Sequence, residues 1–193
     1  MNLKNVLTIS AGVFWLLAFA ADMSAQRRDF MSEAEIEIIR ETPDIDERIE
    51  VITRMIDRRF HVLNVNVNGW KDAGKPSDVW GELPKGTRAE LFNDIKKLLQ
   101  KAVDDIDNLA ANPNAAPIRD KGDKKAKKDP ERFPASVRTL ASAAGRYLVP
   151  LKNEMDKSTS EIEKGSLIDS IELCDQILQA VGKLPPEAKK TKN

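Results

Sequence analysis

The sequence predicts an all-α protein, an antiparallel four-helix bundle with long connecting loops, preceded by an N-terminal signal peptide. Charged residues make up 32% of the chain and aromatic residues only 5%, a balance typical of amphipathic helices with solvated outer faces. Apolar residues recur at steps of three and four along four segments of about 20 residues each. An uncharged apolar run near the N-terminus has the position and length of a secretory signal.

The signal is predicted from the charge pattern of its ends. Lys4 supplies the positive start, residues 6–21 are uncharged and mostly apolar, and Asp22 ends the run. Cleavage fits after Ala20 or after Ala25, and we favour Ala25. An uncleaved anchor is the alternative reading. A helix of this length would span about 24 Å, however, which is less than the ~30 Å hydrocarbon core of a membrane.

Cleavage at residue 25 divides the chain into a signal peptide (1–25), a helical domain (26–182) and a disordered lysine-rich tail (183–193). The domain is expected in the periplasm or outside the cell, without stable membrane insertion. One basic and one acidic residue leave with the signal, so 31 − 1 = 30 of each remain. This balance gives no general attraction to nucleic acid or to an anionic membrane.

Residues 32–64 show a helical pattern with an interruption at Pro43. Ser32 is a suitable N-cap for a first turn that contains Glu33 and Glu35. Thr42 is a suitable N-cap for the next helix, with Pro43 at its first position, where a missing N–H costs nothing. The core-facing stripe of this second helix is Ile45, Ile49, Ile52, Ile56, Phe60 and Leu63.

The helical period breaks over residues 65–86, which glycine and proline punctuate. We interpret this segment as a long ordered connection, with Trp70 and Trp80 folded back onto the helices. Ordered loops of this length are uncommon unless they have a role of their own.

A further helix and a linker follow this connection. Thr87 and Glu90 fit a capping box that opens a helix over 87–109. A flexible basic linker follows at 110–133, because the segment is rich in lysine and has no apolar periodicity. It connects two helical hairpins that either close as one bundle or remain loosely joined.

The last two helices are predicted from Pro134 onward and over about 160–181. Pro150 should kink the first of them, because it cannot donate a hydrogen bond to the carbonyl four residues back. Gly165 could interrupt the second helix near its start, and Gly182 is a suitable C-cap.

An apparent calcium motif follows the first long helix. Asn64, Asn66, Asn68 and Gly69 occupy the first, third, fifth and sixth positions of an EF-hand-like spacing. Calcium prefers charged oxygen ligands and a glutamate at the twelfth position, which here is Lys75. A turn stabilised by asparagine side chains explains the pattern better.

The residues that could support catalysis or metal binding are few. His61 is the only histidine, and Asp57 lies one helical turn before it, but no cluster of histidine or cysteine could complete a metal site. Cys174 is the only cysteine and lies on an apolar stripe, where it would act as a small hydrophobic residue. We therefore expect no enzyme activity, no metal and no cofactor.

These observations favour an exported, non-catalytic module for protein interaction or structure. The alternative is a small-ligand carrier that binds between the helices near the tryptophans. An enzyme with an unfamiliar site around Asp57 and His61 is a third reading. A protein partner is expected, nucleic-acid binding is unsupported, and a homo-oligomer remains open. The residues expected to contact a partner or ligand are Trp70, Trp80, His61 and Tyr147.

Overall fold

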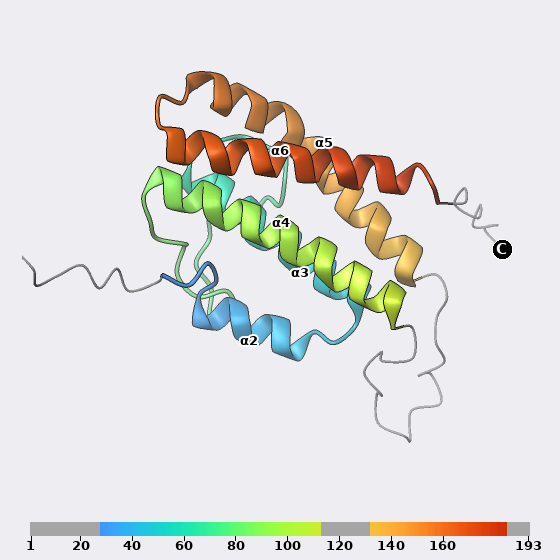
Figure 1. Cartoon of the computed structure of the whole chain (residues 1–193). Helices are drawn as coiled ribbons and strands as arrows, with labels where there is room; N and C mark the ends of the chain where they lie inside the picture. The colour runs from blue at the N-terminus through green and yellow to red at the C-terminus, as the bar shows by residue number, and fades with distance from the viewer. Residues whose placement is uncertain (1–27, 113–131, 185–193) are drawn as a thin grey trace, which may run out of the picture.

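The computed structural model describes residues 28–112 and 132–184, and in these two ranges it is all-helical (Figure 1). This confirms the all-α part of the prediction. The predicted signal peptide, most of the predicted linker and most of the predicted tail lie outside the described residues. The described part has five helices and no strand: α2 (Glu33–Glu41), α3 (Ile45–Val62), α4 (Arg88–Ala111), α5 (Arg132–Lys157) and α6 (Glu161–Val181).

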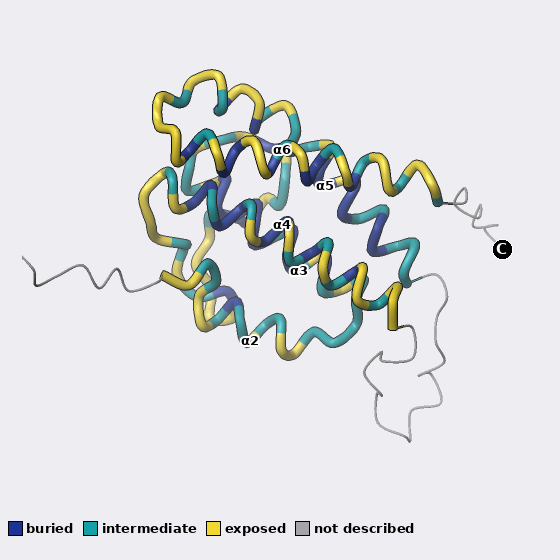
Figure 2. Tube along the Cα trace, viewed as in Figure 1, coloured by how far each residue is buried: buried dark blue, intermediate teal, exposed yellow. Residues whose placement is uncertain are grey.

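The four long helices pack around a common core. Helices α5 and α6 form a hairpin, α4 packs against α6 and α3, and α3 packs against α5. The short helix α2 lies against α3 on the outside of this group (Figure 1). Buried residues follow the inward sides of the long helices (Figure 2), as the apolar stripes predict. None of the described helices combines the length and apolar character needed to cross a bilayer.

The predicted caps are confirmed at two helix starts and wrong at a third. Ser32 and Thr87 both form complete capping boxes, with Glu35 and Glu90 respectively. The prediction that Thr42 caps the next helix is wrong, because Thr42 ends α2 and Asp44 is the N-cap of α3. The Thr42 hydroxyl donates to the carbonyl of Ile38 at 2.7 Å. It therefore contributes to the end of the preceding helix.

The interruption expected at Gly165 is absent, whereas the helix that contains Pro150 bends. Helix α6 runs through Gly165 without interruption, since a glycine costs a helix only about 1 kcal/mol relative to alanine. Helix α5 begins at Arg132, two residues before Pro134, and continues through Pro150. The α5 ribbon changes direction part-way along its length (Figure 1), as expected for an internal proline.

Candidate functional site

The segment between α3 and α4, residues 63–87, is irregular as predicted, and we call it the tryptophan loop. Its first turn depends on asparagines in the left-handed conformation, with φ of 57° at Asn64 and 49° at Asn68. The side-chain oxygen of Asn66 accepts a hydrogen bond from the Asn68 amide at 2.9 Å. The interpretation of these residues as an asparagine-stabilised turn is confirmed.

Asp57 of α3 attaches this loop to two helices. Its side chain is only 4% exposed. One carboxylate oxygen accepts from the backbone amide of Trp70 at 2.7 Å. The other accepts from the Tyr147 hydroxyl at 2.8 Å and from the Arg146 guanidinium at 3.4 Å. Buried carboxylates need such donors, because an unpaired charge is costly away from water.

Tyr147 of α5 is fully buried behind this carboxylate. Its hydroxyl also lies 3.1 Å from the carbonyl of Thr53, and its ring contacts that of Phe60 at a centroid distance of 5.1 Å. Burial and the nearby Asp57 charge raise the pKa of Tyr147 well above its usual value. Tyr147 is therefore a neutral hydrogen-bond donor, enclosed in the core.

The loop approaches α3 so closely that it requires glycine at one position. A Cβ atom on Gly69 would overlap the carboxylate of Asp57. That carboxylate is fixed by its three donors and cannot easily move aside. The absence of a side chain at Gly69 is what allows the Trp70 amide to reach Asp57.

Arg58 anchors the far part of the loop. It is fully buried, and its Nη2 donates to the carbonyls of Gly81 (3.3 Å) and Glu82. Its Nε and Nη1 have no hydrogen-bond partner among the described residues. The guanidinium lies 5.6 Å from the centre of the Trp80 ring, an attractive cation–π contact. Burial lowers the pKa of Arg58.

The two loop tryptophans contact each other, with ring centroids 5.1 Å apart. Trp80 is buried, whereas Trp70 is half-buried and carries Arg54 at 5.6 Å from its ring centre. Since Arg54 and Arg58 lie one turn apart on α3, the helix supplies one cation to each ring. The prediction that both tryptophans fold back onto the helices is confirmed.

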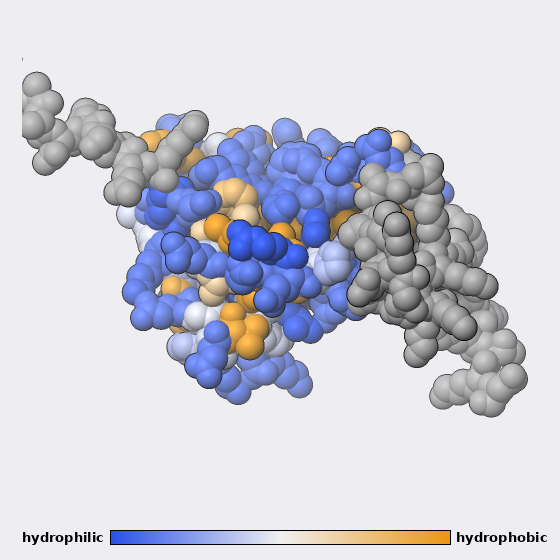
Figure 3. All heavy atoms as spheres, turned by 90° about the horizontal axis from the view of Figure 1, so that it is seen from below, coloured by the Kyte–Doolittle hydropathy of each residue, from blue (hydrophilic) through white to orange (hydrophobic). Residues whose placement is uncertain are grey.

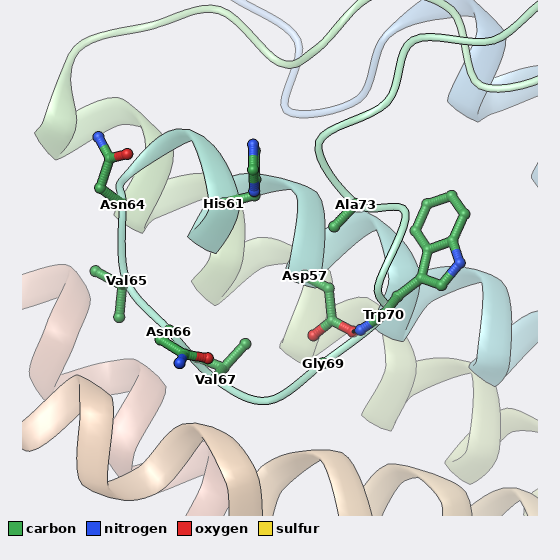
Figure 4. A pocket seen from close by; sticks show the side chains of 9 residues that line it. All are labelled: Asp57, His61, Asn64, Val65, Asn66, Val67, Gly69, Trp70 and Ala73. Carbon is green, nitrogen blue, oxygen red and sulfur yellow. Dashed lines mark hydrogen bonds between the residues drawn. The ribbon is translucent and has the colours of Figure 1, made fainter.

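His61 lies at the exposed end of the same junction. Its imidazole and the Asp57 carboxylate point in different directions (Figure 4), although both come from α3. The His61 side chain forms no hydrogen bond or ion pair with any described residue, and the loop passes over it so closely that a Cβ on Gly74 would overlap the ring. The two groups therefore do not form an acid–base pair.

A cavity of about 280 Å³ lies between the loop and α3 (Figure 4). Polar side chains and backbone surround most of it. The lining residues are Asp57, His61, Asn64, Val65, Asn66, Val67, Gly69, Trp70 and Ala73.

The structure brings together some of the four residues expected to contact a ligand. Trp70 and His61 line the same cavity. Trp80 contacts the Trp70 ring at a tilted angle but is buried, and Tyr147 reaches the site only through its bond to Asp57.

Sequence reasoning missed Arg58 and Arg146 as anchors of the loop. Arg146 donates to the carbonyl of Val67 at 3.3 Å as well as to Asp57. Their partners lie 23 and 79 residues away along the chain, and no local pattern signals such contacts.

The chemistry available at this junction is limited. Among the described residues, no group of three or more histidine, cysteine, aspartate or glutamate side chains could hold a metal ion. Asp57 already accepts three hydrogen bonds, so its charge is used to hold the fold together. Comparisons with known proteins find no matching family, no matching curated protein and no matching solved structure.

Proposed function

We propose that the chain is an exported, non-catalytic binding protein that contacts a protein partner through its tryptophan loop. In this proposal α3–α6 form an antiparallel four-helix bundle, and residues 1–25 act as a signal peptide that directs the mature protein to the periplasm or the medium. One observation supports the binding site best: a rigid turn in the loop holds an exposed valine away from the core.

This turn covers residues 77–81. The Gly81 amide donates to the Ser77 carbonyl at 2.7 Å, and the Trp80 amide donates to the Ser77 hydroxyl at 3.0 Å. Gly81 has a φ of 62°, which favours glycine. The two hydrogen bonds and the glycine fix the backbone of a short, tight turn.

Two contacts directly after Val79 hold the turn to α3. Trp80 is buried, and Arg58 donates to the carbonyl of Gly81. Val79, next to Trp80, is 65% exposed. An apolar side chain on a preorganised support loses little conformational entropy when a partner covers it, so more of its burial contributes to affinity.

Residues near the turn suit a protein interface. Trp70 is half-buried with Arg54 over its ring, and tryptophan and arginine are frequent among the residues that dominate binding energy. Lys75, Asp78 and Glu82 are exposed around it and would supply a polar rim. Figure 3 shows one side of the molecule, where the surface is mostly hydrophilic and its apolar areas are small and separate.

The geometry around Asp57 supports a non-catalytic role. A catalytic carboxylate needs a free lone pair directed at substrate, whereas both oxygens of Asp57 accept bonds that hold the fold together. His61 faces away from it (Figure 4).

A pair of valine variants tests the proposed surface. Val79→Lys places a charge on the turn, and Val149→Lys makes the same change on α5, where the valine is 62% exposed. Each protein is cross-linked in its native compartment and the adducts are identified by mass spectrometry. We expect one adduct that forms with the unsubstituted chain and with Val149→Lys but not with Val79→Lys. An adduct pattern identical in all three proteins would reject the surface.

Export is tested on the intact protein. We expect the mass of the chain recovered from the periplasm or medium to correspond to a start at Gln26, or at Ala21 for the alternative cleavage. A chain found only inside the cell with all 193 residues would reject export while leaving the binding surface to its own test.

The cavity beside Trp70 supports a second candidate function, a small-ligand carrier. Its volume of about 280 Å³ is near the lower end of ligand sites. If this cavity holds a ligand, the fluorescence of Trp70 should change when pools of lipids, haem or metabolites are added, and the change should disappear in Trp70→Phe. A fluorescence signal that never responds would remove the support for a carrier.

A further inference from the structure

A second cavity, also of about 280 Å³, lies where α4 and α6 end and α5 begins. It shares no lining residue with the cavity at the tryptophan loop. Three helices and the turn after α6 supply its walls. The lining residues are Val103, Ile106, Asp107, Phe133, Val137, Leu140, Gln176, Ile177, Ala180 and Leu184.

The cavity exists because apolar helix faces continue past the point where the helices diverge. On α5 the face includes Phe133, Val137 and Leu140, and on α6 it includes Ile177 and Ala180, at helical steps of three and four. The first half of α5 and the last half of α6 separate toward this end of the molecule (Figure 1). The side chains at this end therefore line an open apolar space.

The walls define what the space can hold. Eight of the ten lining residues are apolar, so an occupant would gain from burying an apolar body there. An apolar cavity of about 150 Å³ holds benzene. A space of about 280 Å³ is large enough for a fused two-ring body of the size of naphthalene.

Asp107 is the one charged residue in the lining. It is exposed, and it forms no hydrogen bond or ion pair with the other described residues. No lining residue carries a positive charge to offset it. An anionic head group would therefore be repelled at this rim, whereas a cationic head group would be attracted.

We propose that this cavity binds a small amphiphile with an apolar body of one or two rings and a cationic amine head, which lies beside Asp107. Gln176 supplies a further polar contact for the head. The inference is independent of the partner surface on the tryptophan loop, because the two regions have no residue in common.

A matched pair of probes tests the site on the full chain. The two compounds, 1-naphthylmethylamine and 1-naphthoate, have the same ring system with opposite charges at pH 7. In isothermal titration calorimetry we expect the amine to bind about tenfold more tightly than the carboxylate. Equal affinities, or no heat with either compound, would overturn the proposal.

Two phenylalanine variants locate the binding. Ala180 is exposed at the rim, so Ala180→Phe fills the cavity entrance without disturbing the core. Ser142 is exposed on α5 and does not line the cavity, so Ser142→Phe introduces the same side chain elsewhere as a control. We expect Ala180→Phe to weaken binding of the amine at least about tenfold and Ser142→Phe to change it less than about twofold. If both variants bind as the original chain does, the amine occupies another site and the assigned cavity is wrong.

A variant of Asp107 tests the preference of the cavity for a cationic head group. Asp107→Asn keeps the shape of the rim and removes its charge. It should bring the affinities of the amine and the carboxylate to within about twofold of each other, while the circular dichroism spectrum stays unchanged. A preference for the amine that persists in this variant would overturn the assigned role of Asp107.

Discussion

The carboxylate of Asp57 accepts a hydrogen bond from the hydroxyl of Tyr147 at 2.8 Å, and this bond connects α3 to α5. The same carboxylate holds the backbone of Trp70 at 2.7 Å. One buried aspartate thus joins segments that lie 13 and 90 residues away in the chain. The position of the tryptophan loop depends on this residue.

Removing the Tyr147 hydroxyl should loosen this connection without changing the packing of the ring. Tyr147→Phe keeps the contact with Phe60 and leaves one oxygen of Asp57 with Arg146 alone. We expect the free energy of unfolding to fall by about 1–3 kcal/mol, the cost of leaving a buried polar group without its partner. Urea unfolding followed by circular dichroism measures this value. An unchanged midpoint would show that the bond does not stabilise the fold.

Two glycines of the tryptophan loop should respond differently to alanine. Gly69→Ala drives a methyl group into the fixed carboxylate of Asp57. We therefore expect the free energy of unfolding to fall by about 1–3 kcal/mol. Gly74→Ala meets only the imidazole of His61, which is exposed and can rotate away. Its effect on the urea midpoint should be small, and it should vanish when His61→Ala is added. Equal losses from both substitutions would contradict the distinction.

The sequence predicts the helices well because their determinants are local. Ser32 and Thr87 cap their helices through partners three residues away, and the apolar period marks the buried faces. The irregular nature of residues 65–86 is likewise evident from glycine, proline and asparagine. In each case the residues that carry the sequence pattern lie within a few residues of the structural feature that they determine.

The contacts that hold the tryptophan loop could not be predicted in the same way. By their sequence pattern Arg58 and Asp57 are ordinary charged residues of an amphipathic helix, yet both are buried because the loop covers them. Thr42 shows the same limit at short range, because its hydroxyl donates to the end of α2 although the sequence predicts that Thr42 caps the next helix. Which partner a polar group finds is decided by tertiary packing.

Cys174 should be unreactive in the folded protein. It is fully buried, and burial raises the pKa of its thiol from 9.0 to about 12. Because the thiolate is the reactive form, iodoacetamide at pH 8 should label the thiol only when urea is present. Labelling of the native chain at the rate of the unfolded chain would contradict this burial.

The thiol of Cys174 also makes the free energy of unfolding depend on pH. The folded chain keeps the Cys174 proton at pH values where the unfolded chain loses it, because the folded pKa is the higher one. The contribution of the Cys174 thiol to the free energy of unfolding is therefore complete below about pH 9 and is lost as the pH rises toward 12. Tyr147 shifts in the same direction. Urea midpoints measured between pH 8 and 11 should fall, with a smaller fall in Cys174→Ala.

The buried ion pair between Glu35 and Arg59 should be the strongest electrostatic attachment of α2. Glu35 is fully buried and accepts from both terminal nitrogens of Arg59, at 2.6 and 2.7 Å. Glu35→Gln keeps the capping box, which accepts either residue, but it removes the charge and one of the two oxygens that accept from Arg59. We expect the free energy of unfolding to fall by up to about 3–5 kcal/mol, the typical cost of leaving one buried charge without its partner, because Arg59 keeps an ion pair with Asp94 at the longer distance of 3.8 Å.

Glu90 provides the matched control, because it occupies the same position in the capping box of α4 but is exposed. Its one salt bridge within the described part of the chain, with Arg28, has a separation of 3.8 Å. Glu90→Gln should therefore lower the free energy of unfolding far less than Glu35→Gln does, and that small effect should shrink in 1 M NaCl, where exposed charges are screened. The cost of Glu35→Gln should persist in the same salt, since water and ions do not reach the pair. Equal salt dependence in the two variants would mean that Glu35 is open to solvent and that α2 is not fixed through Arg59.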